Sequence, residues 1–311
     1  MKKLFAILFL LAIITGSCTK EYHNPTTVDN GNNNNGGGGN GGGGNGGGGG
    51  GGGGGNGISP VPSTFTQKVL IEEFTGEWCG FCPDGLLELE NAENSAPGKV
   101  YGASCHNGDP FTLSPFDQDF ETTFPPTGYP TAMVNRVPQG SAVTLDRPWT
   151  GAAAMQLANT AVCGLAMSSY TVGSDSLYVE VHCGFNTTLA GDYRLTIYLL
   201  EDDVPAVHQS NYYDDGSYGP GPLVGIGNPI TTWAHNDVIR EVLTGEFGDA
   251  IPASKMIPGG EYVIKYGGTI TGFVKNNLKI TAFINKIGTS STTHQVMNVQ
   301  QAKVAEIKDW D

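Results

Sequence analysis

Basic residues are scarce in this chain of 311 residues. It has 16 lysines and arginines against 30 aspartates and glutamates, which gives a formal charge of −14. This balance argues against binding to nucleic acid and against electrostatic docking on anionic lipid, because both carry dense negative charge. Solubility in a compartment outside the cytoplasm is the simplest interpretation of the charge.

Several site patterns are also missing. There is no second Cys-x-x-Cys, and His106 alone does not complete a tetrahedral set of metal ligands. The glycine tract is too regular for a phosphate-binding loop and lacks its lysine, and no Ser/His/Asp spacing is convincing. The sequence therefore predicts no metal site and no bound cofactor.

The chain begins with an apolar run at residues 4–14, behind two lysines. The run is too short to span a bilayer and predicts an export signal over residues 1–17. The small residues before Cys18 resemble a bacterial lipoprotein box, in which the cysteine is lipidated, although Thr15 stands where leucine is usual. Thr19, rather than aspartate, favours the outer membrane. The alternative is an ordinary signal peptide with an incidental cysteine.

Residues 18–58 predict a disordered tether. Residues 30–57 are nearly all glycine and asparagine, and such a segment cannot bury apolar surface. About 40 flexible residues have an end-to-end distance of roughly 35 Å. The remaining chain of about 250 residues suffices for two modest domains, predicted at 59–160 and 161–311.

The first of these domains begins with a strand that runs into a Cys-x-x-Cys. Val69–Ile71 is an apolar run typical of a buried strand, and Leu86–Glu90 has helical character. Between them lie Cys79 and Cys82, and Pro83 suits the first turn of a helix. Free amide groups at a helix start stabilise a thiolate, so Cys79 is the candidate nucleophile on the solvent side. Cys82, within intramolecular reach, is the candidate resolving thiol.

This segment, Glu73-Phe74-x-x-x-Trp78-Cys79-Gly80-Phe81-Cys82, resembles the active site of thioredoxin-fold proteins, and protein disulfide isomerases most of all. The later run Gly128–Thr131 is similar to the cis-proline loop of that fold. The resemblance implies that Glu73 is a buried proton acceptor behind Cys82, although it could be a solvated carboxylate at a strand end. The candidate catalytic residues are Cys79, Cys82, Glu73 and Pro130, and the candidate docking residues are Trp78, Tyr129 and Thr131. Gly80-Phe81 contains no histidine, so the direction of exchange stays open.

Further elements fit an α/β unit. We expect a strand at residues 100–105, an inserted helix or loop at 114–124, a strand at 131–135 and a closing helix at 149–159. From residue 161 the apolar period changes to two, which predicts an all-β sandwich. The expected strands lie at 177–183, 193–200, 238–243, 261–266, 278–284 and 295–304.

Two features of the second half stay open. Cys163 and Cys183 fall on the apolar faces of adjacent expected strands, so they form either a structural disulfide or two small buried side chains. Residues 202–230 read mostly as loop. Their aromatic and acidic residues, including Tyr212 and Tyr213, form either a binding surface or the decoration of a sheet edge.

The runs Tyr198–Asp202 and His235–Arg240, together with the CGFCP segment and His106-x-Gly108-Asp109-Pro110, resemble the twenty-eight-kilodalton outer membrane protein family. The resemblance implies a lipoprotein of the Gram-negative outer membrane, with a thioredoxin-like half followed by a β-sandwich. It defines architecture better than activity.

Two functions remain. The first is a candidate enzyme, a lipid-anchored thiol–disulfide oxidoreductase that acts on exported or envelope proteins with cysteines and needs a redox partner of unknown identity. Its only membrane contact would be the N-terminal lipid. The second is an interaction lipoprotein whose sandwich binds a partner and whose Cys-x-x-Cys is structural. An exposed, reducible Cys79 favours the first function, and a buried disulfide that resists reduction favours the second.

Overall fold

The computed structural model describes residues 57–311. The predicted signal peptide, the predicted lipid site Cys18 and nearly all of the predicted tether lie outside the described residues.

Helices and strands alternate as far as residue 157, and strands dominate after it. The helices are α1 (Cys82–Ser95), α2 (Phe116–Thr123) and α3 (Thr150–Leu157), with short 3₁₀ turns at Ala253–Lys255, Lys275–Asn277 and Ser291–Thr293. The strands are β1 (Val69–Thr75), β2 (Val100–His106), β3 (Thr131–Val134), β4 (Cys163–Val172), β5 (Ser176–Phe185), β6 (Tyr193–Glu201), β7 (Val204–Pro205), β8 (Ala234–His235), β9 (Val238–Val242), β10 (Asp249–Ala250), β11 (Glu261–Thr269), β12 (Leu278–Lys286), β13 (Val296–Lys303) and β14 (Ile307–Lys308).

The longer elements agree with the sequence predictions, and the short strands β7, β8, β10 and β14 were not predicted. The result is a mixed α/β protein in which sheets predominate. Among residues 57–311, no helix combines the length and the apolar character needed to cross a membrane.

One sheet of eight strands takes its strands from the beginning, the middle and the end of the described residues. β1 pairs in parallel with β2 and antiparallel with β3, and β9 adds in parallel to the other side of β2. The order is β13-β12-β6-β9-β2-β1-β3, with β10 on β6. Strands from both sides of residue 160 therefore belong to the same sheet, which periodicity along the chain could not reveal.

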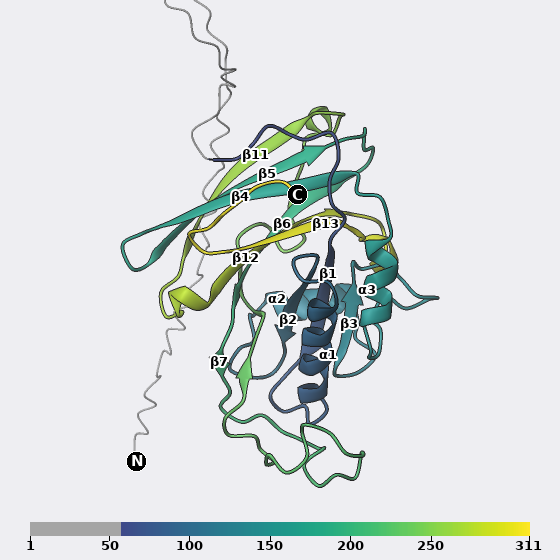
Figure 1. Cartoon of the computed structure of the whole chain (residues 1–311), viewed down its shortest axis with the longest axis vertical. Helices are drawn as coiled ribbons and strands as arrows, with labels where there is room; N and C mark the ends of the chain where they lie inside the picture. The colour runs from purple at the N-terminus through teal and green to yellow at the C-terminus, as the bar shows by residue number, and fades with distance from the viewer. Residues whose placement is uncertain (1–56) are drawn as a thin grey trace, which may run out of the picture.

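The two faces of this sheet are covered differently. α1 and α3 pack on one face through a core that includes Val69, Ile71, Leu89 and Trp149. Beside them, a second sheet (β11-β5-β4-β14) covers β6, β12 and β13 on the same face. The phenylalanines of α2 pack on the opposite face. Figure 1 shows the small sheet at the top and α1 and α3 below it.

A buried ion pair joins the segment before residue 160 to the strands after it. Arg136, which follows β3, donates from Nε and Nη2 to the two carboxylate oxygens of Glu72 in β1, both at 2.7 Å. The Tyr198 hydroxyl from β6 donates to the same carboxylate at 3.0 Å. All three side chains are almost completely buried, so this contact fixes β6 against the strand that carries the Cys-x-x-Cys.

Candidate functional site

The Cys-x-x-Cys lies where β1 ends and α1 begins. The Cys79 amide donates to the Gly76 carbonyl and the Cys82 amide to the Cys79 carbonyl, which closes the turn into the helix. Pro83 occupies the first turn of α1, where its missing N–H leaves no bond unmade. Cys79 and Cys82 form a disulfide, with 5.4 Å between their Cα atoms.

Both sulfur-bearing residues are buried, which differs from the prediction that Cys79 faces solvent. Cys79 is 4% exposed and Cys82 is 2% exposed. The reason is a segment far along the chain, residues 206–230, which we call the cover. In Figure 1 it forms the green loop beyond β7, at the end of the molecule where α1 begins.

The cover binds the Cys-x-x-Cys segment through its backbone. The Ser210 amide donates to the Glu77 carbonyl and the Tyr212 amide donates to the Gly80 carbonyl, both at 2.8 Å. In addition, Nε2 of the buried Gln209 donates to the Cys79 carbonyl at 3.2 Å. These bonds place the cover along the Cys-x-x-Cys segment.

Aromatic packing reinforces this contact. The Phe81 ring lies 5.2, 5.8 and 5.1 Å from the rings of Tyr212, Tyr213 and Tyr218. A Cβ on Gly80 would come within 2.3 Å of the Tyr212 ring, so only glycine admits this approach. The tyrosines thus pack against the Cys-x-x-Cys segment. For this loop the sequence left open a binding surface or a decorated sheet edge, and neither alternative included packing on the disulfide. The length of this loop and its aromatic residues were the features of the sequence that could have indicated such packing.

Glu73 belongs to β1, lies against α1 at Gly85 and is almost completely buried. Its Oε2 accepts a hydrogen bond from the Ser104 hydroxyl at 3.2 Å, and its Oε1 has no partner among residues 57–311. Burial raises the pKa of Glu73 to about 8, and the hydrogen bond from Ser104 opposes this only in part. The alternative of a solvated strand-end carboxylate is therefore wrong, and Glu73 holds a proton at neutral pH.

Pro130 and Glu73 meet at the same point of α1. The Tyr129–Pro130 peptide bond is cis, as the sequence predicted. A Cβ on Gly85 would lie 2.4 Å from Oε1 of Glu73 and 2.6 Å from Cβ of Pro130, so both contact the helix one turn after Cys82. The structure thus brings together Glu73, Pro130 and the helix that begins at Cys82.

The three predicted docking residues have different environments. Trp78 is 47% exposed, and its ring packs edge-on against Tyr129 with 5.0 Å between centroids. The Trp78 indole donates to the Asn107 carbonyl at 2.7 Å, and the Tyr129 hydroxyl bonds to Glu121. Thr131 is buried, and its hydroxyl donates to the Gly128 carbonyl within the proline loop.

A buried histidine pair lies beside the turn between β1 and α1. His106 Nδ1 is 2.6 Å from Asp109 Oδ2, and the rings of His106 and His235 lie 4.7 Å apart. Burial lowers the pKa of His235 to about 3, so this ring is neutral. Across residues 57–311, no three His, Cys, Asp or Glu side chains are grouped to hold a metal ion.

The remaining cysteines of the described chain are free thiols. Cys163 and Cys183 are fully buried on neighbouring strands, and no disulfide joins them. In the ladder of β4 and β5, Cys163 faces Phe185 and Cys183 faces Leu165, so the two thiols are diagonal neighbours. The candidate disulfide is therefore not formed, and both cysteines act as small apolar side chains in the core. Cys105 is likewise buried and free.

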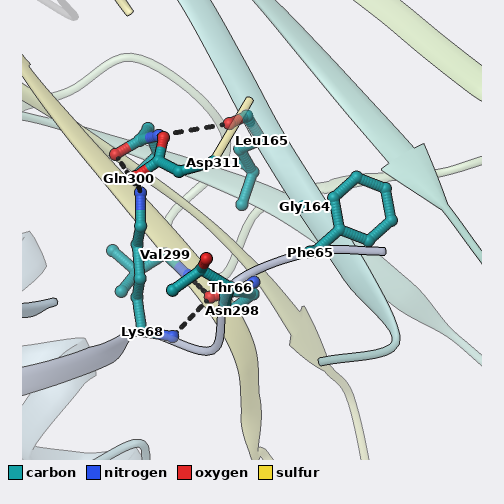
Figure 2. Close-up of a pocket in the computed structure, with 9 residues that line it drawn as sticks. All are labelled: Phe65, Thr66, Lys68, Gly164, Leu165, Asn298, Val299, Gln300 and Asp311. Carbon is teal, nitrogen blue, oxygen red and sulfur yellow. Dashed lines mark hydrogen bonds and ion pairs between the residues drawn. The ribbon is translucent and has the colours of Figure 1, made fainter. Parts of the chain in front are cut away.

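A small cavity lies at the other end of β1. Its volume of about 10 Å³ is room for about one water molecule, too little for an organic ligand. Figure 2 shows Lys68 beside Gln300 and Asp311; its Nζ donates to Gln300 Oε1 at 2.7 Å and forms an ion pair with Asp311. The ion pair with Lys68 holds Asp311 beside this cavity, and neither Cys79 nor Cys82 lines it.

Fold and site together define a sheet-dominated α/β protein that carries a covered Cys-x-x-Cys disulfide at a helix start and a buried carboxyl whose pKa is raised by burial. Residues 117–308 match the family model described as outer membrane protein Omp28. This match covers more than half of the chain, so the protein belongs to the Omp28 family. The predicted family is confirmed, and the family description agrees with the predicted outer-membrane location.

Solved structures with a similar fold include HBP35 of Porphyromonas gingivalis. It is 19% identical, with a TM-score of 0.64, and the match covers 79% of this chain and 78% of that chain. A protein from Agrobacterium tumefaciens is 13% identical over 78% of this chain and 96% of its own, with a TM-score of 0.49. A domain of the outer membrane lipoprotein Omp28 from P. gingivalis is 16% identical over 49% and 92%, with a TM-score of 0.29. No curated protein matches the chain.

Proposed function

We propose that this protein is a lipid-anchored thiol–disulfide oxidoreductase that exchanges disulfides with exported proteins. Cys79 forms the mixed disulfide, Cys82 is the resolving thiol and Glu73 transfers the proton. The observation that carries the proposal is the buried carboxyl of Glu73, whose Oε1 has no hydrogen-bond partner among residues 57–311 and lies against α1 one turn after Cys82. A purely structural disulfide needs no unpaired buried acid beside its helix.

The oxidising direction starts from the Cys79–Cys82 disulfide, which is the form present in the structure. A substrate thiolate attacks the sulfur of Cys79, and the Cys79–Cys82 bond breaks as the mixed disulfide forms. The electron pair of the broken bond leaves on the sulfur of Cys82, which accepts the proton held by Glu73. Because the pKa of Glu73 is about 8, that proton is present at neutral pH.

Release completes the exchange. A second substrate thiolate attacks the substrate sulfur of the mixed disulfide and expels Cys79 as a thiolate. The substrate has then lost two electrons and gained a disulfide, and the protein holds the Cys82 thiol, the Cys79 thiolate and an ionised Glu73. A disulfide-bearing redox partner accepts these electrons and restores the Cys79–Cys82 bond. In the opposite direction, ionised Glu73 accepts the proton of Cys82.

Trapping tests this proposal. Cys82→Ser leaves Cys79 able to attack a disulfide-bearing partner and removes the thiol that would release it, so mixed disulfides should accumulate in the envelope. Cys79→Ser is the matched control and should trap nothing. If Cys82→Ser captures no partner and the wild type neither oxidises nor reduces a test protein, the oxidoreductase function is wrong.

The burial of the disulfide favours a second candidate, an interaction lipoprotein with a structural Cys-x-x-Cys. Cys79 and Cys82 are only 4% and 2% exposed, and an attacking thiolate must reach a sulfur atom. The two candidates differ in reducibility. A disulfide that survives a strong thiol reductant in the folded protein supports the structural role.

The proposed architecture is a thioredoxin-like unit at 59–160 and a β-sandwich at 161–311 that share the large sheet. The parallel pair β1 and β2, the antiparallel β3 after cis-Pro130 and the helix that begins at Cys82 support the first unit. The packing of β4, β5 and β11 on β6 and β12 supports the second. Because β9 extends the sheet at β2, we expect residues 59–160 alone to be less stable than the full chain.

The proposed anchor is a lipid on Cys18, with the tether of residues 18–58 holding the folded part away from the membrane. The motivation is the apolar run that ends in small residues before this cysteine. Mass spectrometry of the membrane-extracted protein should find diacylglycerol on Cys18. A mature chain that starts elsewhere would contradict this anchor.

A further inference from the structure

The cover occupies the position that a substrate needs. Its residues Ser210 and Tyr212 donate backbone hydrogen bonds to the carbonyls of Glu77 and Gly80, which flank Cys79. Both carbonyls belong to the turn between β1 and α1, so a peptide that docks over Cys79 has to displace the cover from them. The cover is therefore an internal segment seated over the disulfide that a substrate would attack, and it keeps that disulfide buried.

One carboxylate fastens the beginning of the cover. Oε1 of Glu77 accepts hydrogen bonds from the amides of Val207 at 2.5 Å and His208 at 3.2 Å. Glu77 is only 4% exposed. The backbone amide of Glu77 donates to Asp109 Oδ2 at 3.0 Å. Hydrogen bonds to a charged acceptor away from water are among the stronger ones in proteins.

The cover has internal order and a narrow base. The Asn211 side chain donates to the carbonyls of Leu223 and Gly227, and Asp214 accepts from the Gly227 amide. At its base, the strands that lead into and out of it, β7 and β8, pair only with each other, over two residue pairs. A segment that holds its own shape, and whose two flanking strands do not pair with the large sheet, can separate as a unit.

We propose that the cover is an autoinhibitory lid, held closed by the Glu77 carboxylate, and that thiol exchange at Cys79 requires its release. This inference rests on the proposed oxidoreductase function and adds its regulation. The lid shields the disulfide from small thiols, and a protein substrate gains access by displacing Ser210 and Tyr212 from the carbonyls of Glu77 and Gly80.

The test compares the full-length wild type with Glu77→Ala, which removes the acceptor of the Val207 and His208 amides. The rate of reduction of the Cys79–Cys82 disulfide by dithiothreitol should rise about tenfold or more, as expected from the loss of a charged hydrogen-bond acceptor. Hydrogen exchange of peptides from 206–230 should accelerate in parallel. Glu88→Ala removes one negative charge from α1, where Glu88 makes no side-chain bond within residues 57–311, and should match the wild type.

A second variant tests the same inference if Glu77→Ala does not fold. Tyr212→Ala removes the ring that packs against Phe81 and should also speed reduction. Faster exchange of the lid peptides with an unchanged reduction rate would show that the cover does not gate the disulfide, and overturns the inference. Unchanged exchange of those peptides in Glu77→Ala overturns the role of Glu77.

Oxidation of a reduced test protein separates this inference from the proposed function. Faster dithiothreitol reduction in Glu77→Ala supports the lid even where neither protein oxidises the test protein, and in that case the oxidoreductase function fails alone. Oxidation of the test protein by the wild type, with equal dithiothreitol rates in both proteins, keeps the function and removes the lid.

Discussion

Replacing Glu73 by glutamine should remove part of the pH dependence of the protein's stability. Burial raises the pKa of this carboxyl from its usual 4.5 to about 8, with a smaller repulsion from Asp237, and the nearby charge of Arg147 and the Ser104 hydroxyl act in the opposite direction. The folded state therefore binds a proton more tightly than the unfolded state does. This stabilisation is complete below about pH 4.5 and is lost as the pH rises through about 8.

The magnitude follows from the size of this difference. Each unit of pKa corresponds to about 1.4 kcal/mol, so ionised Glu73 costs the folded state on the order of 5 kcal/mol. Glutamine has nearly the same shape and does not titrate. Between about pH 5 and about pH 9, the free energy of unfolding of Glu73→Gln should therefore rise by several kcal/mol relative to the wild type.

Urea unfolding of the oxidised proteins, followed by tryptophan fluorescence at each pH, measures this difference. Glu93 also has a pKa raised to about 8, mainly by burial, and contributes to the slope of the wild type. Because Glu93 is present in the wild type and in Glu73→Gln alike, its contribution cancels in the difference between the two proteins, and that difference is the diagnostic quantity. A difference for Glu73→Gln that stays constant over the whole pH range would refute the buried, protonated state.

Three other predictions concern stability and are measured by urea unfolding. Glu72→Gln should cost about 3–5 kcal/mol because it leaves the buried guanidinium of Arg136 without its anion, and the double variant Glu72→Met/Arg136→Met should recover most of this; a loss below about 1 kcal/mol contradicts the role of the pair. Cys183→Val should change stability by less than about 1.5 kcal/mol, whereas loss of a disulfide would cost about 2–5 kcal/mol. Asp311→Asn, which keeps the main-chain contact with Thr66, should cost about 1 kcal/mol, a modest value because the carboxylate is partly exposed, and most of this cost should disappear in a Lys68→Met background.

Local pattern was sufficient for the elements and for part of the site. The apolar run at Val69–Ile71 and the period-two alternation of Leu177, Val179 and Val181 fixed strands that the structure contains. These patterns work because a buried strand or a half-buried strand must place its apolar side chains in a set order. The cis bond before Pro130 and the burial of Glu73 followed from resemblance to a known active site, and both are present.

The pairing of distant strands depended on tertiary structure. The parallel contact of Ser104 with Val238 extends one sheet across the predicted domain boundary. Backbone hydrogen bonds make this contact, and they leave no mark on the choice of side chains. For the same reason, the alternation of Cys163 and Cys183 predicted a shared core but not their register, which sets each thiol opposite an apolar residue of the other strand.

The sequence by itself determined the chemistry available at this site: two cysteines at a helix start, an acid at the end of the preceding strand and a proline loop. Tertiary structure alone decided whether that chemistry is accessible. The cover reaches Glu77 and Gly80 from about 130 residues further along the chain, mainly through main-chain amides that every non-proline residue possesses. Since any sequence can supply such donors, only the folded chain shows where they bind and that they bury the disulfide.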